Sequence, residues 1–362
     1  GDNRYKNGVN RYTNGDNRYT NKDYNMAKRD MTFLNGIIKS LEKELLTPAT
    51  LMRIIDEPDY KSAFRALKEQ GFGKNAATDE ADSEAILQAE TLALDDFARE
   101  FSPGDEYSEF CLSGIDFYNA ERLLRSGYIR SFGFVQTRTG LIGDVAAALK
   151  TGEKNAKYGK AGQSGGKDKN SLLQELVSAY AEGKALFESG KASGAEISSI
   201  FIKARYARLL KKCGGQLNAF LKNEIDCKNI STALRAKTQD EIDKLFIGGG
   251  NLKKEDVDFI FSQDADKTEK RFAFTPFAEV IALAEKEKSA GTPLIGFEAA
   301  ADGFALKELK KKKYETEGAT PFVLYYLYKS AEIKNVRIIL TGKRAGASAE
   351  DIKRRLRTGY DG

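Results

Sequence analysis

The sequence contains no histidine among its 362 residues. Imidazole is the usual general base near neutral pH and a common zinc ligand. Its absence excludes histidine-dependent catalytic triads, Cys-His pairs and histidine-bearing zinc sites. Catalysis would have to use Lys, Glu, Tyr or metal-bound carboxylates. Catalysis therefore stays open as a reduced possibility. The acidic residues show no metal-like spacing, and we expect no metal and no cofactor.

Cysteines and long apolar runs are also scarce. The three cysteines, Cys111, Cys213 and Cys227, form no Cys-x-x-Cys pair. No secretory signal pattern opens the sequence, so we expect a reduced, cytosolic compartment. The longest apolar run, residues 321–328, is much shorter than the roughly 20 residues that cross a bilayer. Any membrane association is therefore expected to depend on a protein partner.

The composition favours helices. Only 6 residues are proline, whereas Ala, Leu, Lys and Glu, which are good helix formers, are plentiful. The net charge of +5 comes from 58 basic and 53 acidic residues, which indicates a mixed surface and not a nucleic-acid-binding composition. The length is sufficient for two or three domains.

Residues 1–23 differ from the rest, because they repeat Asn, Arg, Tyr and Gly with a period of seven. Their positions at heptad spacing are not aliphatic, and Asn and Gly disfavour helix. We predict a disordered polar tail and exclude it from the fold. The alternative is an Arg/Tyr arm that binds nucleic acid by charge and stacking.

From residue 24 onward the apolar residues recur at helical spacing. A helix is predicted from residue 31 to 45, and Thr47-Pro48 predicts the capped start of a second helix. A third should end at Gly71, and residues 80–101 predict a fourth. Further helices are predicted at 171–190, at 194–223 and from 276 to the end, with loops at 150–170 and 246–256. The fold class is therefore all-α.

One short pattern occurs three times. An acidic residue stands three positions before an asparagine, and a leucine follows five positions after it. The copies are Asp116, Asn119, Leu124; Asp226, Asn229, Leu234; and Glu332, Asn335, Leu340. The asparagines are 110 and 106 residues apart, close to one third of the 339 residues that follow the tail. This spacing indicates an internal triplication.

The three-residue spacing places the acid and the asparagine on one face of a helix. Such a pair can bond to a neighbouring helix end or accept a bond from a basic side chain. A structural contact that seats one helix on the next is the simpler interpretation, and a catalytic acid beside an amide is the alternative. We prefer the structural interpretation, because catalysis rarely needs three equal copies.

The last third resembles a known family. It has an acidic pair, then Pro and Tyr, then Glu-x-x-Asn-x-Arg with Gly-Lys; these residues are Glu298, Asp302, Pro321, Tyr325, Glu332, Asn335, Arg337, Gly342 and Lys343. This pattern resembles the C subunit of the V-type and A-type rotary ATPases, the counterpart of the eukaryotic d subunit. The Gly-rich segment 240–260 and the helices of residues 27–59 resemble the same family. The resemblance covers about residues 24–358.

The resemblance implies three similar helical domains around a pseudo-threefold axis that form a funnel. We expect domains at 24–128, 129–240 and 241–362, after the tail at 1–23. The implied role is a non-catalytic rotor adaptor on the cytoplasmic face of the membrane, peripheral to it. Its partners would be the central stalk and the proteolipid ring, to which it transmits torque. Arg337 and Lys343 are candidate contacts to these partners.

Other functions remain open. The chain could be a stand-alone α-helical scaffold or interaction protein, although solenoid repeats are about 20 to 45 residues long. It could be an enzyme that uses carboxylates and lysine. Residues 343–359 could bind nucleic acid, but acids interrupt this basic run, and Ser348 to Asp351 form a capping box that predicts the start of the last helix.

Overall fold

A computed structural model describes residues 31–74, 76, 82–126 and 166–360. Within these ranges the chain is helical and contains no strand, as the composition predicted. The chain divides into two compact units, and we describe each by itself. One unit combines residues up to 105 with residues 312–362, and the other comprises residues 106–311. Among the described residues, the first unit therefore combines an early and a late part of the sequence.

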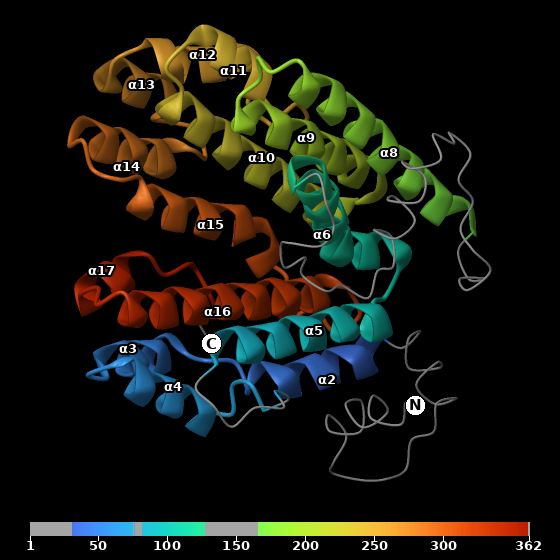
Figure 1. The fold of residues 1–362 in the computed structure, drawn as a ribbon, viewed down its shortest axis with the longest axis vertical. Helices are drawn as coiled ribbons and strands as arrows, with labels where there is room; N and C mark the ends of the chain where they lie inside the picture. The colour runs from blue at the N-terminus through green and yellow to red at the C-terminus, as the bar shows by residue number, and fades with distance from the viewer. Residues whose placement is uncertain (1–30, 75, 77–81, 127–165, 361–362) are drawn as a thin grey trace. The chain divides into compact units, whose positions relative to one another are not determined.

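The first unit is built around one long helix, α16. Its members are α2 (Met31–Glu42), α3 (Pro48–Asp56), α4 (Tyr60–Glu69), α5 (Ser83–Phe101), α16 (Thr320–Arg344) and α17 (Ala349–Arg354). Helices α2, α4 and α5 pack against α16, and α17 packs against α3 (Figure 1). Phe97 of α5 stacks on Phe322 of α16, with ring centroids 5.2 Å apart. Residues more than 200 positions apart thus share one apolar core.

The second unit contains α6 and all helices from α8 to α15. They are α6 (Asp105–Ser126), α8 (Gly166–Glu188), α9 (Gly194–Lys212), α10 (Gly215–Arg235), α11 (Gln239–Leu245), α12 (Lys254–Ser262), α13 (Ala265–Phe272), α14 (Ala278–Ser289) and α15 (Ile295–Lys310). Phe117 and Leu124 of α6 pack with apolar residues of α8 and α9. These three helices share one apolar cluster.

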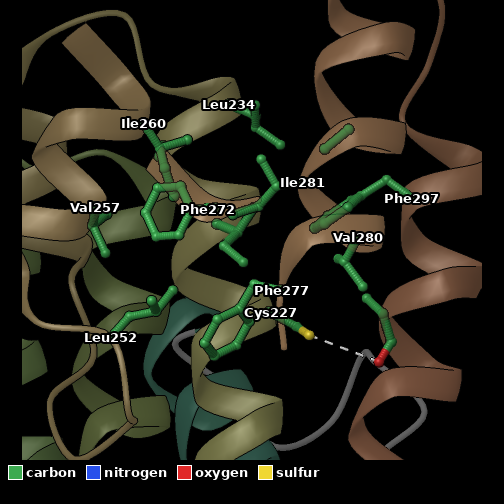
Figure 2. Packing of buried hydrophobic residues seen from close by; sticks show 14 of the residues in the cluster. Cys227, Leu234, Leu252, Val257, Ile260, Phe272, Phe277, Val280, Ile281 and Phe297 are labelled. Carbon is green, nitrogen blue, oxygen red and sulfur yellow. Dashed lines mark hydrogen bonds between the residues drawn. The ribbon is translucent and has the colours of Figure 1, made fainter. Parts of the chain in front are cut away.

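A second cluster in this unit joins α10 to helices α12–α15 (Figure 2). Ile230 of α10 is completely buried among residues such as Val257 and Ile281. The thiol of Cys227 donates a weak hydrogen bond to the carbonyl oxygen of Ala301, at 3.7 Å. Burial raises the pKa of this thiol to about 12, so Cys227 behaves as a small apolar residue.

Several local sequence signals are confirmed. Thr47 caps α3, where its side chain accepts a bond from the backbone N–H of Thr50 at 3.2 Å, and Pro48 occupies the first helical position. Gly71 follows the end of α4 with φ +83°, a conformation that favours glycine. Ser348 caps α17 by accepting from the N–H of Asp351. These signals need only neighbouring residues, which explains why the sequence reveals them.

Two predicted boundaries are wrong. The helix expected at 194–223 is interrupted at Cys213 and Gly214, between α9 and α10. Gly215 has φ +53°, a conformation that the apolar spacing does not reveal. Residues 166–170, the last part of the loop expected at 150–170, belong to α8, and the rest of that loop lies outside the described residues. The loop predicted at 246–256 corresponds to the shorter connection between α11 and α12.

The sequence predicts three domains, whereas the structure divides into two compact units. The expected boundary near 128 and the tail at 1–23 lie outside the described residues. The expected boundary near 240 falls within α11, inside the second unit. The division into three domains around a funnel therefore stays a prediction.

Candidate functional site

The three acid–asparagine pairs predicted from the sequence lie on three long helices. Asp116 and Asn119 are on α6, Asp226 and Asn229 on α10, and Glu332 and Asn335 on α16. All six side chains are at most 4% exposed. Burial of a charged or amide group is unfavourable unless hydrogen bonds satisfy it, so the contacts of each pair are informative.

On α10, Asn229 binds both polar groups of one backbone residue. Its Nδ2 donates to the carbonyl oxygen of Ile247 at 2.8 Å, and its Oδ1 accepts from the N–H of the same residue at 2.9 Å. Ile247 lies in the connection between α11 and α12. An amide is suited to this task because it carries a donor and an acceptor side by side. We call this arrangement an amide clamp.

Asp226, one turn before Asn229, binds the next part of the same connection. Its Oδ2 accepts from the N–H and the Nδ2 of Asn251, at 3.0 and 2.8 Å. Its Oδ1 accepts from the N–H of Leu252 at 2.9 Å. A Cβ at Gly250 would lie 2.2 Å from this Oδ1, so only glycine fits there. Three donors thus satisfy a carboxylate that has no ion pair among the described residues.

The same clamp occurs on α16. The Nδ2 of Asn335 donates to the carbonyl oxygen of Arg357 at 3.0 Å, and its Oδ1 accepts from the N–H of Arg357 at 2.7 Å. Arg357 follows α17 in an irregular segment. In both clamps the bound residue comes after the asparagine in the chain, by 18 residues on α10 and 22 on α16.

The buried carboxylate of Glu332 is satisfied by a different set of groups. Its Oε2 accepts from the N–H of Leu46 at 2.5 Å, and its Oε1 accepts from the Nζ of Lys329 at 2.5 Å. Lys329 also contacts the Oε2 of Glu90 at 2.7 Å, and the Oε1 of Glu90 accepts from the N–H of Gly73. One lysine therefore joins two buried carboxylates, and each carboxylate holds a loop. We call Lys329, Glu90 and Glu332 the charge triad.

The charge triad keeps its lysine protonated. Burial alone lowers the pKa of Lys329, but the negative charges of Glu332 and Glu90 outweigh that effect, and the net shift is upward. A lysine that stays charged at all physiological pH values is unsuited to act as a general base. The geometry therefore supports a structural role for Glu332.

The two acids bind equivalent points of the fold. Leu252 lies two residues before α12, and Leu46 lies two residues before α3. Both helices have nine residues. In each unit the acid thus fixes the entry to a short helix, and the asparagine fixes an irregular segment. That the pairs seat one helix on the next stays a prediction.

The pair on α6 is as deeply buried as the other two. Asp116 is 2% exposed, and Asn119 is 0% exposed. Within the part of the chain that the structure describes, neither amide atom of Asn119 has a hydrogen-bond partner. Leu124, like Leu234 and Leu340, lies in the core. The helical register is therefore the same in all three copies.

Arg337 and Lys343, the candidate partner contacts, make contacts within their own unit. The guanidinium of Arg337 bonds to both carboxylate oxygens of Glu84, at 2.8 and 3.0 Å. About half of the Arg337 side chain and two thirds of the Glu84 side chain remain exposed. The Nζ of Lys343 donates to the carbonyl oxygen of Glu57. Arg337 thus presents charge at the surface, whereas Lys343 closes the end of α3.

The second unit also carries a surface groove of about 1170 Å³ along α8 and α9. Its charged lining includes Glu175, Glu182, Lys203 and Lys211. Among the described residues, no three His, Cys, Asp or Glu side chains come together as a metal site would require. The groove therefore offers mixed charge without a recognisable catalytic arrangement.

Sequence reasoning missed the partners of the acids. Lys329 stands one turn before Glu332, a spacing that predicts an ion pair on a helix, but its second partner Glu90 is 239 residues away. Gly250 was part of a Gly-rich segment, and its role follows from the close approach of Asp226. Only the lysine spacing offered a local signal for these contacts.

Comparison with known proteins identifies relatives. The family model described as "ATP synthase (C/AC39) subunit" matches residues 166–355, more than half of the chain. The C subunit of the A-type ATP synthase of Halorubrum lacusprofundi is 32% identical over 163 residues, which cover 42% of this chain and 47% of that protein. Its namesake from Haloquadratum walsbyi is 25% identical over 337 residues, 85% of this chain and 89% of that protein.

The share of each relative that the chain covers differs. The chain spans about half of the Halorubrum protein and 42% of the namesake from Haloferax volcanii, with which it shares 30% identity. In the described residues no helix is both long and apolar enough to cross a membrane.

Proposed function

Because the chain belongs to the ATP synthase (C/AC39) subunit family, we propose that it is a non-catalytic rotor adaptor of an A-type or V-type ATPase. In this role it links the central stalk to the membrane proteolipid ring and transmits torque for ion transport or ATP synthesis. It would lie peripherally on the cytoplasmic side of the membrane. The observation that carries the proposal is the family match over residues 166–355.

The buried acid–asparagine pairs support this role. An adaptor under torque needs stiff connections between its helices, and an amide clamp or a buried charged network is costly to break. Three pairs at intervals of 110 and 106 residues are consistent with three similar domains in a funnel. In the two pairs whose partners are described, both asparagines bind backbone, and both acids accept at least one backbone N–H. They therefore support architecture in preference to chemistry.

The direct test is capture from detergent-solubilised membranes of a cell that makes the tagged chain. We expect stalk and ring subunits of the ATPase to co-purify. Recovery of the chain alone, under conditions in which another subunit of the same complex captures the assembly, would favour the stand-alone scaffold and overturn the adaptor proposal.

A variant of Arg337 makes the capture experiment more specific, because the partner of this side chain within the chain, Glu84, is known. The Arg337→Glu variant should fold, since an exposed ion pair contributes only about 0–1 kcal/mol. We expect it to capture less of the complex. The double variant Arg337→Glu with Glu84→Arg restores the internal pair but leaves the charges exchanged. If the double variant regains full capture, Arg337 serves only the internal pair with Glu84.

A further inference from the structure

Glu285 lies on α14, in the second unit, and its carboxyl group is buried without a partner. The residue is 2% exposed, and among the described residues its Oε1 has no hydrogen-bond partner. Buried polar groups in native proteins are almost always satisfied, as the carboxylates of Asp226 and Glu332 are in this chain. Glu285 departs from that rule and requires a physical account.

Glu287, two residues further along α14, shows how this helix satisfies a carboxylate. Its Oε1 accepts from the N–H of Gly296 at 2.8 Å, and its Oε2 accepts from the N–H of Phe297 at 2.9 Å. Both donors belong to the first turn of α15. At Glu285 the Oε1 receives no such bond. An ionised carboxylate there would therefore lose its contact with water without compensation.

The charged groups around Glu285 disfavour its ionised form. Burial raises the pKa of Glu285 above its ordinary value of 4.5, and the negative charges of Glu269 and Asp264, on the α13 side, raise it further against the opposing charge of Lys288. Lys288 is exposed, so water screens its charge. Helices α10 and α15 also pack on α14, and they contribute apolar side chains such as Phe297 to the shared core cluster.

Helix α13, which packs on α14 beside these acids, is held by few contacts. It has eight residues, of which only Thr268 and Phe272 are buried. Phe272 lies in the core cluster (Figure 2), and Arg271 pairs with Asp256 of α12 at 2.7 Å. The hydroxyl of Thr268 is also buried without a hydrogen-bond partner among the described residues. Short elements with few buried side chains open most readily.

We propose that Glu285 and α13 form a pH-sensitive latch. While Glu285 carries a proton, α13 stays packed on α14. When the carboxyl group loses its proton, the buried negative charge favours an open state in which α13 moves away and water reaches the carboxylate. The opening involves α13 because it is shorter than α10, α14 and α15. The latch lies within one unit and does not depend on the complex that the chain joins.

Hydrogen exchange of the full chain, read by mass spectrometry from pH 4.5 to neutral pH, tests the latch. After correction for the intrinsic exchange rate, the opening constant of α13 should rise as the pH increases above 4.5, by up to about tenfold per pH unit, and then level off. The amides of α10 should show no such rise. A pH-independent opening constant of α13 would overturn the proposal. An equal rise in α10 would also overturn it, because it would indicate global unfolding.

Variants show whether Glu285 is the group responsible. In Glu285→Gln the opening constant of α13 should stay the same over this pH range. Glu279→Gln changes an exposed glutamate of the same helix and should keep the rise of the parent protein. If Glu285→Gln does not fold, Glu285→Leu, which replaces the ionisable group with an apolar one, decides in its place. A rise like that of the parent protein in a folded variant without Glu285 would assign the pH dependence to other acids and refute the latch.

Discussion

The pairs on α10 and α16 use their asparagines identically and their acids differently. Asp226 receives three hydrogen bonds from the connection it holds and needs no cation. Glu332 receives one backbone bond, and Lys329 supplies the remaining partner. The comparison teaches that the number of backbone donors decides whether a buried carboxylate requires a positive charge. Glu332, which accepts only one backbone N–H, pairs with Lys329, and Lys329 in turn pairs with a second acid, Glu90.

The largest expected effect is on the charge triad. Lys329→Met leaves Glu90 and Glu332 buried without a cation, and breaking a buried ion pair in this way costs about 3–5 kcal/mol. Lys222→Met is the matched change near Asp226, where the acid depends on backbone donors, and it should cost less than about 1 kcal/mol. Urea unfolding followed by circular dichroism measures both. Equal losses would show that the two acids do not differ as described.

Replacing the asparagine of either amide clamp should lower stability by a similar amount. Asn335→Ala and Asn229→Ala each leave a backbone N–H and C=O without their partner, and we expect each to lower the free energy of unfolding by roughly 1–3 kcal/mol. Asn223→Ala, a less buried position on α10, is the control and should change little. Thermal melts of the three variants check this. A variant of either clamp that melts like the parent protein contradicts the shared mechanism.

An effect of similar size but confined to one connection is expected at Gly250. In Gly250→Ala the new Cβ would meet the Oδ1 of Asp226 at 2.2 Å, so the connection must move, and such overpacking costs about 1–3 kcal/mol. Gly248→Ala is a suitable control, because its Cβ meets nothing within 4 Å. We expect the first variant to lose stability and the second to keep it. Equal melting temperatures would show that the connection yields easily.

The smallest expected effect is the pH dependence of the α10 pair. Burial raises the pKa of Asp226 above its ordinary value of 3.8, against the opposing effect of the N–H donors of Leu252 and Asn251. A raised pKa means that the folded state binds the proton more tightly. Its contribution to stability is therefore complete below pH 3.8 and is lost as the pH rises through the folded pKa.

Comparison with Asp226→Asn isolates this contribution from the other titrating groups. The stability of the parent protein relative to this variant should decline between pH 3.8 and neutral pH, measured by urea unfolding at each pH. A relative stability that increases over this range would mean that the N–H donors dominate and that the pKa is lowered.

Local signals predicted much of the helical structure. Apolar spacing located α2 and α5, and Thr47-Pro48 and Ser348 located two helix starts. The break between α9 and α10 was missed, because the apolar pattern continues across Gly214 and only backbone geometry interrupts it. The acids and asparagines of the candidate site were singled out by their spacing, but the spacing does not give the groups that they bind.

What the sequence by itself determined is the helical class, the register of the three acid–asparagine pairs and the family to which the chain belongs. These follow from residue type and short-range spacing. The tertiary structure decided which backbone the pairs on α10 and α16 bind and that described residues before 105 and after 312 form one unit. Leu46 and Glu332 are 286 residues apart, and no helical period relates them. Their contact exists because a buried carboxylate must find a donor, and the folded core brings that donor to it.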